Sequence, residues 1–307
     1  MKKPFLLFLL VFGFITALHA APAHEMQGFY FAVIDQPTVS NDIHLQAEID
    51  RIRPQQLAFV IANGVRAEDE PCTDALYRER KSLLEESDKP LFLSLAGSDW
   101  IGCKNEDGSD IHSDRLRRLR EILFENDTAF GMVSMPLTRQ SHIAKYSDYP
   151  ENTYWQQDAV LFATVNLPAD NNHYLNAAGR NNEFEERLVA NRYWLHRLFT
   201  LASRNRMDGI VIFCDGNPFE NDSARKTGAR DGFQEIRQLL TKLADGFSGK
   251  VLIIHGEARQ KNQAITWKNN LGIAAAGSKW LEIHVNPGSR QLFSIAKPPA
   301  AKKKKAW

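Results

Sequence analysis

The residues best suited to chemistry follow short apolar runs along the chain. Asp35, Asn63, Asp99, Asp215 and His255 each stand at or just after the end of such a run. If the runs are parallel strands, their carboxyl ends meet at one edge of a sheet, where α/β proteins hold ligands. Carboxylates and an imidazole at such an edge predict a metal or acid–base site. The competing interpretation is that strand-end loops are polar in every protein, and the pattern alone does not separate the two.

Signatures of several other chemistries are missing from the sequence. The chain has no Gly-x-Ser-x-Gly elbow, no phosphate-cradling Walker loop and no His-Glu-x-x-His pair. Its formal net charge is +1 over 307 residues, which gives no overall field that favours nucleic acid or a membrane surface. We therefore expect no nucleic-acid partner and no membrane span.

The elements that would position these residues alternate between strands and helices. Apolar runs predict three early strands, at 28–34, 57–62 and 91–96. Amphipathic stretches predict a helix after each of them, at 41–52, 74–87 and 113–124. Three strand–loop–helix units in a row predict a parallel sheet covered by helices, and one α/β domain is the simplest organisation. In the later part of the chain, the stretch 136–150 is expected to be rich in loops. Strands are predicted at 158–166, 207–214, 250–254 and 280–285, and helices at 182–204 and 231–244.

The two ends of the chain differ from the rest. Lys2 and Lys3 precede an apolar run that ends at Leu18, and small residues follow, which is the order of a secretory signal peptide. The run is short for a membrane span of about 20 residues. We expect residues 1–20 to be a signal peptide, residues 21–297 a single domain and residues 298–307 a disordered basic tail. The mature protein is then secreted or periplasmic.

The chain has three cysteines, Cys72, Cys103 and Cys214. Cys214 ends an apolar run, so it is expected to be a buried small hydrophobe. Cys72 and Cys103 stand in polar loops, and in an oxidising compartment we predict a disulfide between them.

Two segments resemble motifs of a known superfamily. The segments 71–75 (Pro-Cys-Thr-Asp-Ala) and 96–103 (Ala-Gly-Ser-Asp-Trp-Ile-Gly-Cys) resemble Pro-Cys-Ser-Asp-Ala and Gly-Asp-Asn-Glu-Trp-Thr-Asp-Cys. Those motifs occur in a secreted bacterial branch of the calcineurin-like metallophosphoesterases. The segments 161–168 and 252–257 also look like that branch, and the resemblance covers about residues 29–287. It implies an α/β fold, a two-sheet sandwich flanked by helices (α/β/β/α), with two metal ions at the loop edge.

Carried over residue by residue, the metal site is eroded at its first two strands. Asp35 can serve as the aspartate ligand of the first strand, but Pro37 stands where a histidine often follows. The second strand of the family ends in Gly-Asp, whose carboxylate bridges the two metals. Here Asn63 and Gly64 stand in its place, so the bridging carboxylate is missing.

The later motifs are eroded as well. Ser98 and Asp99 replace the asparagine ligand and its neighbour, and the strand that ends near Asp215 offers no histidine. His255 is retained in the last motif, but Arg259 stands where a terminal histidine is expected. Two divalent ions about 4 Å apart repel by roughly 15–20 kcal/mol at an effective dielectric constant of 20, and anionic ligands must offset that repulsion. A dinuclear centre is therefore not expected, and a single weakly held ion at Asp35, Asp99 and His255 is the more plausible metal site.

The resemblance therefore implies an exported phosphoesterase-fold protein that has lost catalysis and needs no cofactor. A guanidinium binds phosphate or carboxylate through two parallel hydrogen bonds, so Arg259, Trp100 and Asp35 could line a cleft for a phosphorylated or other anionic small molecule. Alternatively, Arg259 pairs with a neighbouring carboxylate and the cleft binds nothing. A third alternative is a metal-dependent phosphoesterase that uses one manganese, iron or zinc ion to activate water.

Overall fold

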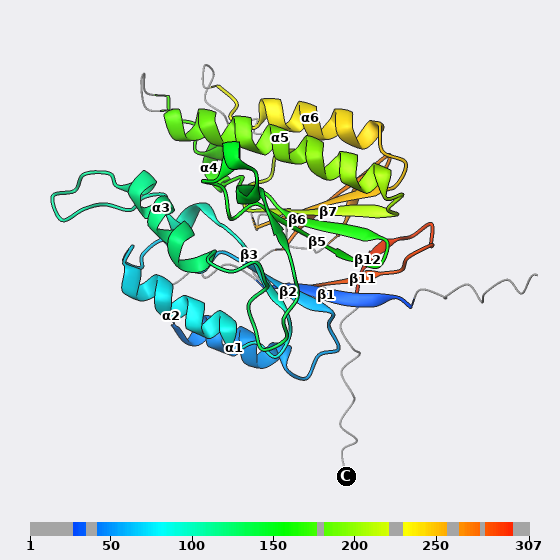
Figure 1. The fold of residues 1–307 in the computed structure, drawn as a ribbon, viewed down its shortest axis with the longest axis horizontal. Coiled ribbons are helices and arrows are strands. Elements are labelled where there is room, and N and C mark those ends of the chain that lie inside the picture. Colours follow the sequence, from blue (N-terminus) through cyan, green and yellow to red (C-terminus); the bar gives the residue numbers. More distant parts are fainter. Residues whose placement is uncertain are drawn as a thin grey trace, which may run out of the picture.

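Two β-sheets form the centre of the molecule (Figure 1). A computed structural model gives the fold and describes residues 27–34, 42–176, 181–220, 230–256, 264–276 and 280–296. One sheet has the strand order β12-β11-β1-β2-β3, and the other has the order β4-β5-β6-β7-β8-β10-β9. The strands of the first sheet are β1 (Phe29–Ile34), β2 (Phe59–Asn63), β3 (Leu91–Ser94), β11 (Leu281–Val285) and β12 (Phe293–Ile295). Those of the second are β4 (Thr138–Arg139), β5 (Thr153–Gln157), β6 (Val160–Thr164), β7 (Gly209–Cys214), β8 (Lys250–His255), β9 (Thr266–Lys268) and β10 (Leu271–Ala275).

The central strands of each sheet run parallel to one another. β1, β2 and β3 are parallel neighbours in the first sheet, and β6, β7, β8 and β10 are parallel neighbours in the second. Parallel neighbours need long crossover connections, and here these connections contain most of the helices. The longer helices are α1 (Asp42–Ile52), α2 (Asp74–Glu85), α3 (His112–Leu123), α5 (Asn182–Arg204) and α6 (Gln234–Asp245). The short turns are η1 (Gly97–Asp99), η2 (Gln140–His142), η3 (Ala144–Tyr146) and α4 (Ala169–Asn172).

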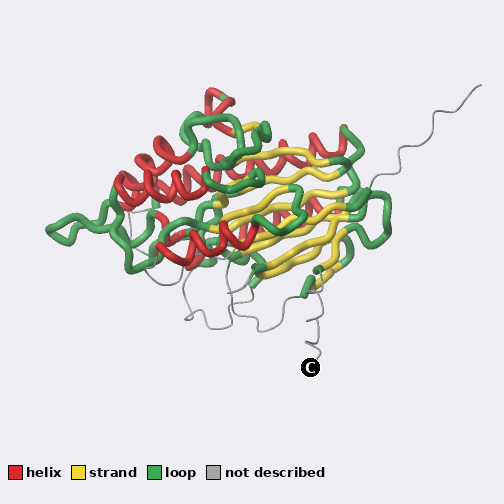
Figure 2. Tube along the Cα trace, turned by 90° about the horizontal axis from the view of Figure 1, so that it is seen from below, coloured by secondary structure: helices red, strands yellow, loops and turns green. Residues whose placement is uncertain are grey.

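Helices and sheets stack in four layers, with α1 and α2 on one side and α5 and α6 on the other (Figure 1). Figure 2 shows the strands lying side by side between the helices. Three hydrophobic clusters fill the spaces between the layers. Representative pairs, taken from the α1–α3 side to the α5–α6 side, are Val60 and Leu119, Phe59 and Phe213, and Ile212 and Leu195. Neighbouring residues such as Phe59 and Val60 face different layers, so both faces of β2 are buried and its sequence is apolar throughout.

The predicted mixed α/β sandwich, with two multi-strand sheets and flanking helices, is confirmed. The three early strands do form a parallel arrangement covered by helices, as predicted, but the residue pattern missed that the later strands form a second sheet. Strands of two stacked sheets have both faces covered, so their sequences look alike and do not reveal which sheet each strand joins. The predicted edge-like strand at 280–285 was also misplaced. It is β11, which lies between β1 and the short strand β12 that the sequence analysis did not identify.

Cys72 and Cys103 form the predicted disulfide, with Cα atoms 5.7 Å apart, and Cys214 is buried, as predicted, and lies outside that disulfide. Such a bond is compatible with an extracytoplasmic location. Within the described ranges, none of the helices has the length and apolar character that a membrane crossing requires. The predicted signal peptide and basic tail, residues 1–20 and 298–307, lie outside the described residues.

Candidate functional site

The carboxyl ends of the parallel strands in the two sheets meet at one end of the sandwich. Asp215, just after β7, accepts a hydrogen bond of 2.6 Å from the backbone N–H of Gly97, just after β3. It accepts another of 2.8 Å from the N–H of Ala169, in the connection after β6. Gly256, just after β8, lies against Asn63 at the end of β2, since a Cβ built on Gly256 would stand 1.8 Å from Asn63 Nδ2. We call Asn63, Ser94, Asp99, Asp215 and Gly256 the strand-end site.

Asp215 is a buried carboxylate that links the two sheets. Its side chain is 3% exposed. Burial raises its pKa, while the N–H groups of Ala169 and Gly97 and the amide of Asn63 oppose that rise. A buried carboxylate costs several kcal/mol unless hydrogen bonds compensate it, and here backbone donors on two different connections do so. Asp215 therefore holds these connections together.

Asp99 is engaged in a similar way. Its carboxylate accepts backbone hydrogen bonds from Val65, Arg66 and Ala96, at 2.8, 3.0 and 2.9 Å. Burial raises the pKa of Asp99 to about 6 despite these donors, and the negative charge of Asp215 adds to the rise. The three bonds fasten the connection after β2 to the connection after β3. Because its lone pairs serve these donors, Asp99 is a poor candidate for a metal ligand here.

Asn63 and Ser94 contribute polar atoms that lack partners. The two residues are neighbours in the β2–β3 pairing, and both are buried. Among the described residues, no hydrogen-bond partner of ordinary geometry reaches Asn63 Nδ2, Asn63 Oδ1 or Ser94 Oγ. Such orphaned groups are uncommon in folded proteins and call for an explanation. Asn63 follows Phe59 and Ile61 in alternation, which places its side chain between the two sheets.

His255 faces the opposite way. Along β8, Val251 and Ile253 pack toward α5 and α6, whereas Leu252 and Ile254 pack between the sheets. The alternation therefore directs His255 toward the helices, away from the space that Asn63 occupies. Burial lowers the pKa of His255 to about 4, and its Nδ1 finds no hydrogen-bond partner in the part of the chain that the structure describes. The structure thus places the predicted ligands Asp99 and His255 at one end of the sandwich but in different layers.

The remaining predicted site residues have separate outcomes. Trp100, a predicted cleft residue, has no exposed surface. Its ring contacts the imidazole of His173 at 4.9 Å and lies 6.0 Å from the guanidinium carbon of Arg187. Trp100 is therefore packed inside the loop that follows β3 and does not line an open cleft. Asp35 and Arg259, predicted to bind a ligand, lie outside the described residues.

The described residues of the strand-end site do not by themselves supply the ligands of a dinuclear metal centre. Such a centre needs several anionic ligands, one of which bridges the ions. Here Asp99 and Asp215 accept backbone N–H bonds, and β2 ends in a neutral amide. Across the described ranges, no three His, Cys, Asp or Glu side chains are grouped so that they could hold a metal ion.

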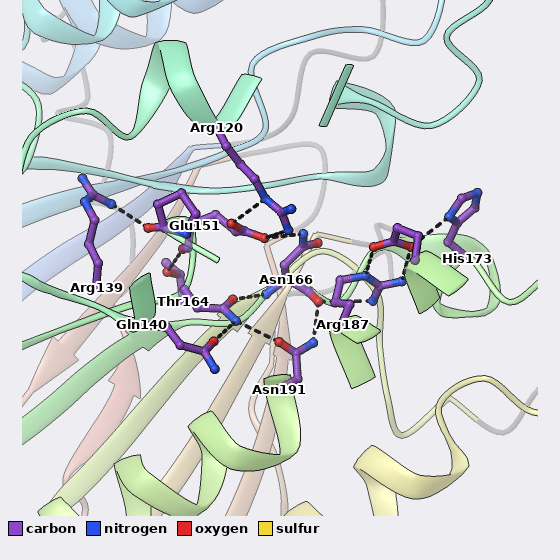
Figure 3. Close-up of polar contacts among 12 residues, drawn as sticks. Arg120, Arg139, Gln140, Glu151, Thr164, Asn166, His173, Arg187 and Asn191 are labelled. Atoms are coloured by element: carbon purple, nitrogen blue, oxygen red, sulfur yellow. Dashed lines mark hydrogen bonds and ion pairs between the residues drawn. The ribbon is translucent and has the colours of Figure 1, made fainter. Parts of the chain in front are cut away.

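A buried polar network, which the sequence analysis did not identify, supports the connection after β6 (Figure 3). Glu151 accepts two hydrogen bonds from Arg120, at 2.9 and 2.6 Å, and a third of 2.9 Å from Asn166. Arg187 of α5 donates to the side-chain oxygen of Asn172 at 2.6 Å and to the carbonyl of Asn166 at 3.3 Å. The clue in the sequence was polar residues inside apolar stretches, such as Arg187 among the buried positions of α5.

That network holds an unusual backbone turn. Asp170, Asn171, Asn172 and His173 all have positive φ angles, between 52° and 57°. A left-handed conformation costs roughly 1–2 kcal/mol per non-glycine residue, so surrounding contacts must stabilise the turn. Asn172 is held by Arg187, and Asn171 and Asn172 also bond the backbone of Gly232. The turn follows directly after Ala169, whose N–H is bound by Asp215.

Comparison with known proteins identifies no family. No family model matches the chain, and no curated protein matches it. Five chains of solved structures match. One of them aligns with 88% of this chain and 99% of its own length, at 9% sequence identity and a TM-score of 0.44. A likeness at that level carries no argument about fold or function.

Proposed function

We propose that this chain is an exported, secreted or periplasmic protein with a calcineurin-like phosphoesterase-type sandwich, which binds an anionic ligand and does not hydrolyse it. The proposed loss of catalysis rests on what the two carboxylates of the strand-end site bind. Asp99 accepts three backbone hydrogen bonds and Asp215 accepts two. The lone pairs of these two carboxylates therefore serve to join loops.

The neutral residue at the end of β2 supports the same proposal. A carboxylate at position 63 would face Asp215 across a buried gap and would need a cation between them. Asn63 removes that need, because its amide favours the charged form of Asp215. We infer that the neutral amide of Asn63 makes a bridging metal unnecessary at this position. Binding of an anion at this end would then depend on Arg259, which stays a prediction.

A second candidate function is favoured by the orphaned oxygens of Asn63 and Ser94. Amide, hydroxyl and carboxylate oxygens are ligands of hard divalent cations, and Asp215 lies beside Asn63. A single ion held there, with Asp35 as a further ligand, would make the protein a metal-dependent phosphoesterase with an altered site. This candidate differs from the first in requiring a stoichiometric metal.

Metal content and turnover distinguish the two candidates. The purified full chain is analysed for manganese, iron and zinc, and hydrolysis of p-nitrophenyl phosphate and bis-p-nitrophenyl phosphate is followed with added Mn²⁺ and with a chelator. We expect less than stoichiometric metal and no turnover. Asp215→Asn serves as the matched variant, because it removes the charge of Asp215 beside Asn63 and keeps the size of the side chain. A stoichiometric metal and chelator-sensitive turnover that Asp215→Asn abolishes would establish the second candidate.

A further inference from the structure

A pocket of about 310 Å³ lies at the end of the molecule away from the strand-end site. Lys81 of α2, Leu123 of α3, residues 125, 126 and 128–131 of the following loop, and Arg139 of β4 line it. Phe130 in that loop exchanges backbone hydrogen bonds of 2.9 and 2.8 Å with Leu91, the first residue of β3. The pocket therefore lies near the amino end of β3, whereas the strand-end site follows its carboxyl end.

Arg139 places a buried positive charge at this pocket. Its side chain is 5% exposed, and its hydrogen bonds go to neutral groups. Nε donates to the carbonyl of Asn126 at 2.9 Å, Nη2 donates to the same carbonyl, and Nη1 donates to the carbonyl of Pro150 at 2.8 Å. A guanidinium has five N–H donors, so these bonds leave two donors on Nη1 and Nη2.

The carboxylates near Arg139 compensate its charge only in part. Asp127 lies 3.5 Å from Nε, is 57% exposed and also contacts His142 at 2.9 Å. Glu151 is buried, but Arg120 binds both of its oxygens. Burial lowers the pKa of Arg139 to about 10, even though both acids act in the opposite direction. The surroundings therefore stabilise this cation less than water would.

Lys81 adds a second cation at the rim of the pocket. Its ammonium group pairs with Glu125 at 3.0 Å, and Glu125 is 67% exposed. An exposed ion pair of this kind contributes little to stability, so Lys81 can exchange Glu125 for another anion at small cost. Glu85 and Glu125 also line the pocket, which limits the ligand to a small anion without a large negative charge.

We propose that this pocket is a binding site for a small oxyanion, a carboxylate or a phosphate group, held by the fork of Arg139 and approached by Lys81. A planar guanidinium binds two oxygens of one such group through parallel hydrogen bonds. The anion would supply the charge compensation that the neutral carbonyls do not give. This site is separate from the strand-end site, so it goes beyond the proposed function and does not depend on it.

The proposal is tested by adding inorganic phosphate or acetate to the full chain. Binding is measured by calorimetry and by the change in unfolding temperature. Chloride at the same ionic strength is the reference. We expect saturable binding in the millimolar range or tighter, and a comparison of the two anions identifies which group the pocket prefers. Arg139→Lys keeps the charge but loses the fork and should weaken binding by roughly tenfold or more.

Two further variants keep the test informative if Arg139→Lys fails to fold. Lys81→Gln, at a partly exposed position, should weaken binding about threefold or more, because it removes one attractive charge at the rim. Arg197→Gln, on the exposed face of α5, removes a charge of the same sign elsewhere and should leave binding unchanged. The proposal is overturned if neither anion binds saturably, or if Lys81→Gln and Arg197→Gln have the same effect.

Discussion

Replacing Asn63 by aspartate tests how the strand-end site works without metal. A Cβ built on Gly256 stands 1.8 Å from Asn63 Nδ2 and 3.0 Å from Asp215 Oδ1. The two side-chain atoms are therefore at most about 5 Å apart, and two unit charges at that distance repel by about 3 kcal/mol at an effective dielectric constant of 20. Asn63→Asp should lower the free energy of unfolding by about that amount at neutral pH in the absence of metal.

The sign of the pH dependence sharpens this prediction. Repulsion raises the folded-state pKa of the new carboxyl group above its unfolded value, so the folded protein holds a proton that the unfolded chain releases. Stability then falls as pH rises from the unfolded pKa through the folded one. The loss in Asn63→Asp should be larger at pH 8 than at pH 5, as measured by urea denaturation with a chelator present.

The matched control is Asn105→Asp, which makes the same chemical change at an exposed position. It should shift stability by less than about 0.5 kcal/mol. If Asn63→Asp is as stable as the wild type at pH 8 without metal, the reasoning about buried like charges is wrong. If Mn²⁺ restores only the Asn63→Asp variant, the site can still accept a metal once its carboxylate is returned.

Three further predictions concern the same end of the molecule. Gly256→Ala should cost about 2–3 kcal/mol, because its Cβ would overlap the amide of Asn63, and the double variant with Asn63→Ala should recover part of that loss in denaturant titrations. The raised pKa of Asp99, about 6, means that stability falls as pH rises from about 4 to above 6. Asp99→Asn should reduce that fall. Denaturation curves of the wild type and the variant at pH 4.5 and 7.5 test this, and an equal loss of stability in both proteins would contradict it. Replacing Cys72 and Cys103 by serine opens a loop with a sequence separation of 31 residues and should cost about 3–4 kcal/mol, with no further loss on adding a reductant.

Much of the fold could be predicted from the sequence because most strands are continuous apolar runs and most helices are amphipathic. The two-residue strand β4 and the exposed strand β9 have no such pattern, so the sequence did not reveal them. Trp155 in the unrecognised strand β5 is buried and stacks on Phe92 at 3.6 Å. An aromatic residue in an unrecognised strand does not reveal whether it faces the core or solvent.

The candidate site could be predicted only in part. The sequence indicated that polar residues follow the strands, and the structure brings Asn63, Asp99 and Asp215 to one end of the sandwich. It could not indicate that Asp99 would bind the N–H groups of Val65 and Arg66, because these partners depend on how two loops meet. Nor could the sequence indicate that His255 and Asn63 face different layers of the sandwich, because this depends on which sheet each strand joins.

The position of β1 between β2 and β11 has a consequence for folding. β1 contains Phe31, whose partner in β11 is Ile283, more than two hundred residues later in the chain. Until that late segment is synthesised, β1 exposes an unpaired apolar edge, which is a template for association with other chains. Contacts so distant in sequence also close slowly. During synthesis there is therefore a long interval in which association with other copies of the chain, through the unpaired edge of β1, competes with correct folding.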